Sequence, residues 1–545
     1  MGNRMSCGGF HLRYRQRWLA ALLALASGTT ASPAAAQSAV PMMAQPAAAV
    51  FPIRGFNILG DNPLADGETT RILARYLRTD ATIETLQQAT VALETALRDK
   101  GHGLYRVVLP PQEVGTTVTL NILRFTVNKV EIEGRTRNDE ANIRRALPAL
   151  REGQTPNFKA LAIQAAIANE NPNKQVQVGI RESSEPDQID ATITVRESRP
   201  WNFGVNVSNA GSRASGQDRV TVSGSHTNLL NLDHQLVAAY TTSLERAADV
   251  RQLGLSYRAP LYSVGGVLDA SYTRSDVVGD FGAFSSTGAG QTAGLRYTLY
   301  LTPVGGSRSY LTLGIDDKVF DASKINDTVV PGQLDRRSRP VSLVYTVRTQ
   351  SALALWGAHV EVAANTGSGS GNNLDSYRTE DPRIATTRWK AVRGGISYAA
   401  PFAAVWNVGL RGQFQFSPDV LISGEQFGLG GLGSVRGTSF ERPMSGDKGM
   451  SATVEVTTPE VAPGLRLLAF ADAGWLGNND PNGTTKPGSD RLGSVGLGLR
   501  YGNGPFTLAV DYGRLVQGSR VPLEFNSAAP QKGDDRIYIN LSARF

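Results

Sequence analysis

Polar and apolar positions alternate along the second part of the chain, from Trp201 to Phe545. The alternating segments are about ten residues long and are separated by turns rich in Gly, Asn, Asp, Ser and Pro, which is typical of strands with two different faces. The pattern predicts sixteen strands, near residues 201–208, 219–226, 234–243, 250–258, 265–274, 291–301, 308–318, 339–348, 355–365, 387–399, 405–416, 448–458, 464–473, 491–501, 505–514 and 536–545.

The strand-rich region has the features of a membrane barrel. No apolar run of about 18 residues follows residue 37, so the sequence predicts no membrane-spanning helix. Strands can cross lipid only in a closed barrel, because every backbone polar group must be paired there. We therefore predict a 16-stranded transmembrane β-barrel over residues 199–545. A water-soluble β-sandwich is the alternative, but a strand pattern of about 345 residues is too long for one sandwich.

Residues 51–198 carry a mixed pattern of strands and helices, and its order occurs twice. In residues 51–124 a strand precedes two helices and two further strands, and Thr82 is placed to cap the longer helix. Residues 125–198 repeat this order, with Asp139 opening a helix that Pro148 stops. The sequence therefore predicts two consecutive copies of one small α+β module. Two unrelated domains are the alternative interpretation.

The N-terminal 37 residues are predicted to be an export signal. Arg13, Arg15 and Arg17 form a basic segment, a short apolar stretch follows, and residues 34–36 offer a cleavage site of small residues. Cys7, the single cysteine, lies inside this segment, so a disulfide scaffold or a cysteine-based site is not expected in the mature chain. Residues 38–50, rich in Ala, Pro and Met, are predicted to be a linker.

A glycine-rich loop at residues 417–447 carries the most specific chemistry of the chain. Arg436 lies in this loop, between predicted strands eleven and twelve, and Asp472 lies in the middle of strand thirteen. An arginine on a loop that folds into the barrel can clamp an acid that faces the lumen, through a bidentate ion pair shielded from water. Removing one partner of such a buried pair typically costs about 3–5 kcal/mol.

Other motifs argue against catalysis and against a nucleotide. Residues 428–433 match the dinucleotide pattern GxGxxG, but no βαβ unit surrounds them and no helix follows. The histidines are scattered, and neither HExxH nor GxSxG occurs, so no enzymatic site, metal site or cofactor is expected. The net charge of +7 comes without a basic cluster interleaved with aromatics, so no nucleic-acid partner is expected.

These features together resemble a known family. The module order and the phrase at residues 130–134 (VEIEG) are similar to the polypeptide-transport-associated (POTRA) domain. Val435-Arg436-Gly437 resembles the VRGY/F signature of two-partner secretion transporters (TpsB, the ShlB/FhaC/HecB-type family), with Thr438 where the family usually has an aromatic. Residues 470–474 (FADAG) resemble the FxDxG motif, whose acid pairs with the loop arginine in the family.

The resemblance implies a function and a set of residues. It implies an outer-membrane translocator of a Gram-negative bacterium, with periplasmic modules, that recognises and secretes an unfolded, β-helix-forming partner exoprotein. It implies a structural latch made of Arg436 and Asp472 with Val435, Gly437, Phe440 and Gly474. The terminal strand, through Ile539, Leu541 and Phe545, is expected to be recognised by the barrel-assembly machinery, and the barrel to contact outer-membrane lipid.

Two other functions remain open on the sequence. A barrel-assembly insertase of the same superfamily is the main alternative, although two modules rather than three or more favour secretion. A passive porin or receptor is a further alternative, but it would need neither the modules nor a loop arginine paired with a strand acid.

Overall fold

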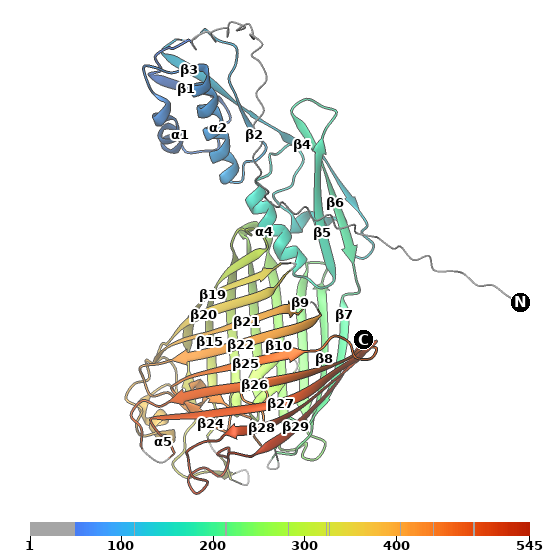
Figure 1. The fold of residues 1–545 in the computed structure, drawn as a ribbon, viewed down its shortest axis with the longest axis vertical. Coiled ribbons are helices and arrows are strands. Elements are labelled where there is room, and N and C mark those ends of the chain that lie inside the picture. The colour runs from blue at the N-terminus through green and yellow to red at the C-terminus, as the bar shows by residue number, and fades with distance from the viewer. Residues whose placement is uncertain are drawn as a thin grey trace, which may run out of the picture. The chain divides into compact units, whose positions relative to one another are not determined.

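The computed structural model describes residues 49–545, apart from 114, 213–214, 282, 323, 326–327, 352, 404, 440 and 483–484. The predicted export signal (1–37) and nearly all of the predicted linker (38–50) therefore lie outside the described residues. Figure 1 shows two small sheets with helices, followed along the chain by a barrel of long strands. Within the described residues, no helix is long and apolar enough to cross a bilayer.

The first module is a three-stranded sheet covered by helices. Strand β3 is central, parallel to β1 and antiparallel to β2. Helix α2 begins at a capping box, in which Thr82 and Thr85 each accept a hydrogen bond from the other's backbone N–H. Its apolar face packs on the sheet in one buried core. The elements are β1 (Gly55–Gly60), α1 (Asp66–Leu73), a 3₁₀ turn (Ala74–Tyr76), α2 (Ile83–Asp99), β2 (Tyr105–Val108) and β3 (Thr117–Arg124).

The second module repeats the topology of the first. Its sheet has the order β4-β6-β5, with β4 parallel to β6. Asp139 and Asn157 cap the two helices with their side chains, as residues with short acceptor groups commonly do. The elements are β4 (Thr126–Glu133), α3 (Glu140–Ala146), α4 (Phe158–Asn169), β5 (Lys174–Glu182) and β6 (Gln188–Glu197).

Sixteen antiparallel strands of the described chain form a closed barrel, as predicted. The short strand β18 (Arg336–Ser338) pairs with β15, as the following strand β19 does, so β18 and β19 are counted together as one barrel strand. The strands are β7 (Trp201–Ser208), β8 (Arg219–Leu229), β9 (His234–Thr242), β10 (Arg251–Leu261), β11 (Gly266–Ser275), β14 (Gly290–Tyr300), β15 (Ser307–Phe320), β19 (Pro340–Gln350), β20 (Leu355–Asn365), β21 (Lys390–Phe402), β22 (Trp406–Phe416), β25 (Lys448–Thr457), β26 (Leu465–Gly477), β27 (Ser489–Asn503), β28 (Phe506–Gln517) and β29 (Asp535–Arg544).

The last strand closes the barrel and shows its two faces. In β29, Ile537, Ile539 and Leu541 are exposed on the outer face, whereas Tyr538 is buried on the inner face. Strand β29 pairs with β7, and the backbones of Phe203 and Phe545 exchange two hydrogen bonds beyond the last residue of β29. An apolar outer face and a polar inner face are expected of a barrel in lipid.

Some loop structure was not predicted. Helix α5 (Leu374–Glu380) interrupts the strand pattern in the connection between β20 and β21, and Asn373 caps it. It forms because Tyr377 and the nearby Trp389 are fully buried in an apolar cluster with the start of loop 417–447. Three short ladders also occur in connections: β12 (Gly279–Phe281) with β13 (Phe284–Ser286), β16 (Lys324–Ile325) with β17 (Thr328–Val329), and β23 (Phe427–Leu429) with β24 (Met444–Gly446).

Candidate functional site

Residues 417–447, here called loop 6, connect β22 to β25 and fold into the barrel lumen. The hairpin β23–β24 packs on the inner faces of β25 and β26, where Phe427 lies against Gly449 and Leu429 against Gly474. Gly430 and Gly431 have φ values of +99° and +96°, which favour glycine. The glycines that resemble a nucleotide motif therefore serve a tight reversal of the chain inside the barrel.

The structure brings Arg436 and Asp472 together at the tip of loop 6. The guanidinium donates from Nε to Asp472 Oδ2 at 2.9 Å and from Nη2 to Oδ1 at 2.8 Å, and the Arg436 backbone N–H donates to Oδ2 at 3.1 Å. Both residues are 4% exposed. The pair is therefore bidentate and shielded from water, the geometry in which an arginine–carboxylate contact is strongest.

Two further strands hold the same guanidinium and carboxylate. Arg436 Nη1 donates to Glu455 Oε1 on β25 at 2.8 Å, and Ser494 on β27 donates to Asp472 Oδ2 at 3.2 Å. The Arg436 guanidinium also lies 3.3 Å from the centre of the Phe470 ring, a cation–π contact. We call Arg436, Glu455, Phe470, Asp472 and Ser494 the tip cluster. It fixes the loop tip to three adjacent strands.

Val435, Gly437 and Gly474 shape the backbone and packing around the ion pair. Val435 is fully buried in an apolar cluster with Leu429. A Cβ added at Gly474 would lie 2.2 Å from Leu429 Cδ1 and 3.2 Å from Val435 Cγ2, so a side chain there would displace the loop. Gly437 has a φ of +101°, and its N–H donates to the Tyr538 hydroxyl at 3.0 Å.

Thr438 stands where the resembled family usually has an aromatic residue, and it is held by hydrogen bonds to loop 6 and to β29. Thr438 is fully buried, and its hydroxyl accepts from the backbone N–H of Gly431 at 2.8 Å. The Tyr538 hydroxyl donates to the Thr438 carbonyl at 3.2 Å. The threonine is thus bonded to both the loop and β29. The predicted latch residue Phe440 lies outside the described residues.

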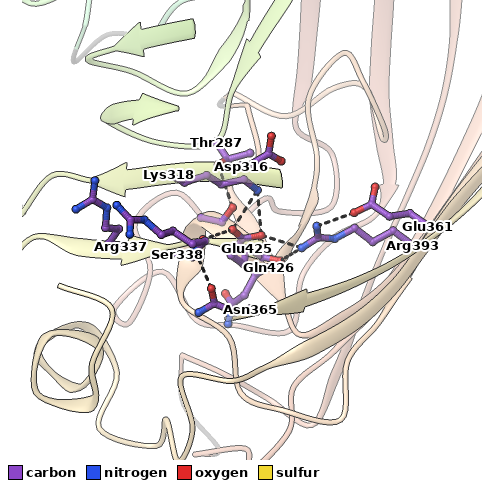
Figure 2. Close-up of polar contacts among 12 residues, drawn as sticks. Thr287, Asp316, Lys318, Arg337, Ser338, Glu361, Asn365, Arg393, Glu425 and Gln426 are labelled. Carbon is purple, nitrogen blue, oxygen red and sulfur yellow. Dashed lines mark hydrogen bonds and ion pairs between the residues drawn. The ribbon is translucent and has the colours of Figure 1, made fainter. Parts of the chain in front are cut away.

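A second ionic cluster at the start of loop 6 was missed by the sequence analysis. Figure 2 shows Glu425 between Lys318, Ser338 and Arg393. Its carboxylate accepts from Ser338 Oγ at 2.6 Å and from Arg393 Nη2 at 2.9 Å, and Lys318 Nζ lies 3.0 Å from Oε1. Arg393 is also 3.4 Å from Glu361 on β20. We call Lys318, Ser338, Glu361, Arg393 and Glu425 the root cluster.

The environment of Glu425 keeps its carboxylate charged. Burial alone would raise its pKa, but the neighbouring charges of Lys318 and Arg393 and the Ser338 hydroxyl lower the pKa of Glu425 to about 2. The root cluster left a weak signal in the sequence. Strand parity places Lys318 and Arg393 on inner faces, so a search for cations facing the lumen would have shown that Glu425 had candidate partners.

Two of the predicted assembly residues, Ile539 and Leu541, lie on the outer face of the last strand, and the third, Phe545, follows directly after it. Ile539, Leu541 and Phe545 are exposed, and Phe545 lies at the closing seam of the barrel beside Phe203. They lie apart from loop 6. Within the described residues, no group of three His, Cys, Asp or Glu is arranged to hold a metal ion.

Two family models match the chain. The model described as haemolysin secretion/activation protein ShlB/FhaC/HecB matches residues 187–501, which is more than half of the chain, and the model described as POTRA domain, ShlB-type, matches residues 51–124.

Curated relatives and solved structures agree with these models. The outer membrane transporter CdiB of Dickeya dadantii (strain 3937) is 23% identical over 448 residues, covering 80% of this chain and 78% of the relative. CdiB of Escherichia coli is 23% identical over 473 residues, which cover 84% of this chain and 78% of the relative. The solved structures of CdiB from Escherichia coli and from Acinetobacter baumannii share the fold, with TM-scores of 0.71 and 0.70 at 19% and 17% identity. They cover 94% and 92% of this chain, and 93% and 91% of theirs. The chain therefore belongs to the haemolysin secretion/activation protein family ShlB/FhaC/HecB, and it is an outer-membrane transporter that secretes a partner exoprotein.

Proposed function

We propose that this transporter passes its partner exoprotein through the barrel lumen in an extended, unfolded state. The observation that carries the proposal is a loop held inside the lumen by ion pairs, because a polar contact of this kind can fix a loop and still be exchanged for other polar groups. The partner is expected to fold at the surface into a β-helix. No nucleotide is expected to drive the transport.

The two modules, assigned to residues 51–124 and 125–198, capture the partner in the periplasm. Each sheet has two edge strands, and in the described structure β2 and β5 pair with one neighbour only. An edge strand offers unpaired N–H and C=O groups to which an extended polypeptide can add as a further strand. Capture by backbone pairing suits a partner that arrives unfolded.

Loop 6 acts as a structural latch in this proposal. Arg436 and Asp472 hold the tip against the wall, while Val435, Gly437 and Gly474 give the close packing that the pair requires. Phe440 is assigned to the same latch. The latch has no catalytic role; it sets the position of the loop in the conduit.

Other parts of the chain bring the transporter to its membrane. Residues 1–37 direct export and are removed, and residues 38–50 link the mature N-terminus to the first module. Ile539, Leu541 and Phe545 on the terminal strand present an apolar, aromatic-ended face to the barrel-assembly machinery and to outer-membrane lipid.

Deletion of the gene tests the function. We expect one large protein to disappear from the culture medium, while the outer-membrane protein profile stays unchanged; both are measured by mass spectrometry of the two fractions. Complementation with the wild-type chain should restore the missing protein. Loss of many outer-membrane proteins would contradict secretion and indicate an insertase.

A further inference from the structure

A large cavity lies between helix α4 of the second module and the inner face of the barrel. It has a volume of about 1810 Å³ and is lined by residues of β15, β19, β20, β21, β22 and β25. An extended strand is about 4.8 by 10 Å in cross-section and advances about 3.4 Å per residue. The cavity, here called the vestibule, therefore has room for about ten residues of extended chain.

Within the described part of the chain, three arginines of the vestibule have no acidic partner. Arg308, Arg348 and Arg411 are exposed, and among the described residues none forms an ion pair or a hydrogen bond with a carboxylate. The guanidinium of Arg348 lies only over the Tyr310 ring, at 5.9 Å.

The acids that line the vestibule are already engaged by other groups. Glu455 accepts from Arg436, and Glu170 accepts from Tyr310 at 2.8 Å and from Arg258 at 3.0 Å. Several other inward-facing cations of the barrel have acids of their own, as in the pairs Arg296–Asp316, Lys318–Glu425 and Arg500–Asp511. The three vestibule arginines therefore carry uncompensated positive charge.

The three arginines lie in one row across five adjacent strands. Arg308 is directly opposite Arg348, and the register then runs through Gly357 on β20 and Ser397 on β21 to Arg411 on β22. Like charges directly opposite each other destabilise a sheet, and departures from local consistency are expected at functional sites. The small side chains of Gly357 and Ser397 leave space between the arginines.

The same row leads to the latch. Arg411 is paired with Thr453, and Thr453 with Asp472, the acid that holds Arg436. A chain bound along the arginines would therefore approach the tip cluster.

We propose that Arg308, Arg348 and Arg411 form an anion-binding site that takes the carboxylates of an extended acidic segment of the secreted partner. The guanidinium fork matches a carboxylate bidentately, and a cleft lined by one sign of charge concentrates groups of the other sign. The site lies inside the barrel beside a periplasmic module, so a polypeptide in transit reaches it and a bilayer lipid does not. The inference rests on the proposed route through the lumen and adds the chemistry of the segment that enters.

Binding of a model peptide to the purified full chain in detergent micelles tests this site. The probe is a fluorescein-labelled peptide of ten glutamates, compared by anisotropy at low salt with ten-residue peptides of lysine and of serine. Of the three peptides, we expect only the glutamate peptide to bind. A triple variant that carries Arg308→Gln, Arg348→Gln and Arg411→Gln should bind it with an affinity about tenfold lower. The charge reversal Arg348→Glu should favour the lysine peptide.

Matched controls separate this site from general charge effects. Arg500→Gln removes an equal charge from a lumen arginine that has its own acid, and it should change the affinity much less than Arg348→Gln. An equal loss in both variants, or equal binding of the glutamate and serine peptides, would overturn the site. Displacement of the peptide by an equal concentration of inorganic phosphate would also overturn it, because the site would then not select polypeptide carboxylates.

The two proposals fail in different ways. A transporter that secretes its partner but does not bind the glutamate peptide contradicts only the arginine site. If the purified chain binds the glutamate peptide but deletion of its gene leaves the proteins of the culture medium unchanged, the secretion route is contradicted and the anion-binding site is not.

Discussion

Loop 6 is held in the lumen by two buried ionic clusters that differ in how they are built. The tip cluster joins one loop residue, Arg436, to acids on two neighbouring strands. The root cluster reverses the charges, because its loop residue is the acid Glu425 and its cations come from the distant strands β15 and β21. In both clusters the central carboxylate, Asp472 or Glu425, is almost fully buried, and a partly exposed charged residue lies at the edge of the cluster.

The two clusters differ in how many contacts secure their central ion. At the tip, Arg436 makes three bonds to Asp472 and one to Glu455, and among the described residues Asp472 contacts no cation other than Arg436. At the root, Glu425 has two cations and Arg393 has a second acid, so the loss of one contact leaves others in place. We therefore expect the tip to fail abruptly on mutation and the root to weaken gradually.

The largest effect is expected for Asp472→Ala. It removes both side-chain bonds to Asp472 and leaves Arg436 with the partly exposed Glu455 as its one acid among the described residues. Removing one partner of a buried pair typically costs about 3–5 kcal/mol. We expect secretion to fall sharply and loop 6 to leave the wall, measured by the maleimide labelling rate of a cysteine introduced at Leu432 in a Cys7→Ser background. Asp511→Ala is the control, because it breaks another lumen ion pair, with Arg500. Equal labelling of both variants would contradict the latch.

A smaller effect is expected for Glu425→Gln. The amide keeps the shape of the carboxylate, and Arg393 retains Glu361, so we expect a cost of about 2 kcal/mol, below that of a fully broken pair. Thermal unfolding followed by gel mobility measures the change. Glu361→Gln, at the partly exposed edge of the cluster, should cost about 1 kcal/mol or less. A larger loss of thermal stability for Glu361→Gln than for Glu425→Gln would contradict the assignment of Glu425 as the central residue of the root cluster.

Gly474→Ala tests packing at the tip without removing a charge. The new Cβ would overlap Leu429 and crowd Val435, and overpacking of this kind typically costs about 1–3 kcal/mol. We expect a labelling rate at Leu432 between those of the wild type and Asp472→Ala. Gly502→Ala is the matched control, since a Cβ there meets nothing within 4 Å. Wild-type behaviour of Gly474→Ala would show that the loop tolerates displacement from β26.

The smallest effect is expected from acid. The pKa of Glu425 is lowered to about 2 in the folded chain, against an ordinary value of about 4.3, so its stabilisation is present above the ordinary value and is lost as the pH falls toward 2. Between pH 7 and pH 5 we expect no change. Below about pH 4, pepsin cleavage of loop 6 should rise more steeply in the wild type than in Glu425→Gln, because the variant has no charge left to lose. Parallel pH profiles would contradict this role of Glu425.

The periodic parts of the molecule were predictable. Sixteen strands, the order of both modules and the cap Thr82 agree with the sequence patterns, since alternation and capping are local properties of the chain. The contact between Arg436 and Asp472 was expected because each residue lies in a short recognisable motif. Helix α5 was not predicted, because its burial depends on Tyr377 and Trp389 meeting residues of loop 6.

The membrane-barrel pattern, the repeated modules and the pairing of Arg436 with Asp472 could all be predicted from the amino-acid sequence. Local rules of alternation, capping and motif spacing carry that information. The folded barrel was needed to show which side chains meet across the lumen. These are the root cluster around Glu425, the close contact at Gly474 and the row from Arg308 to Arg411. Strand register and barrel closure place residues about a hundred positions apart in one row across the barrel wall. The order of residues along the chain does not give that register.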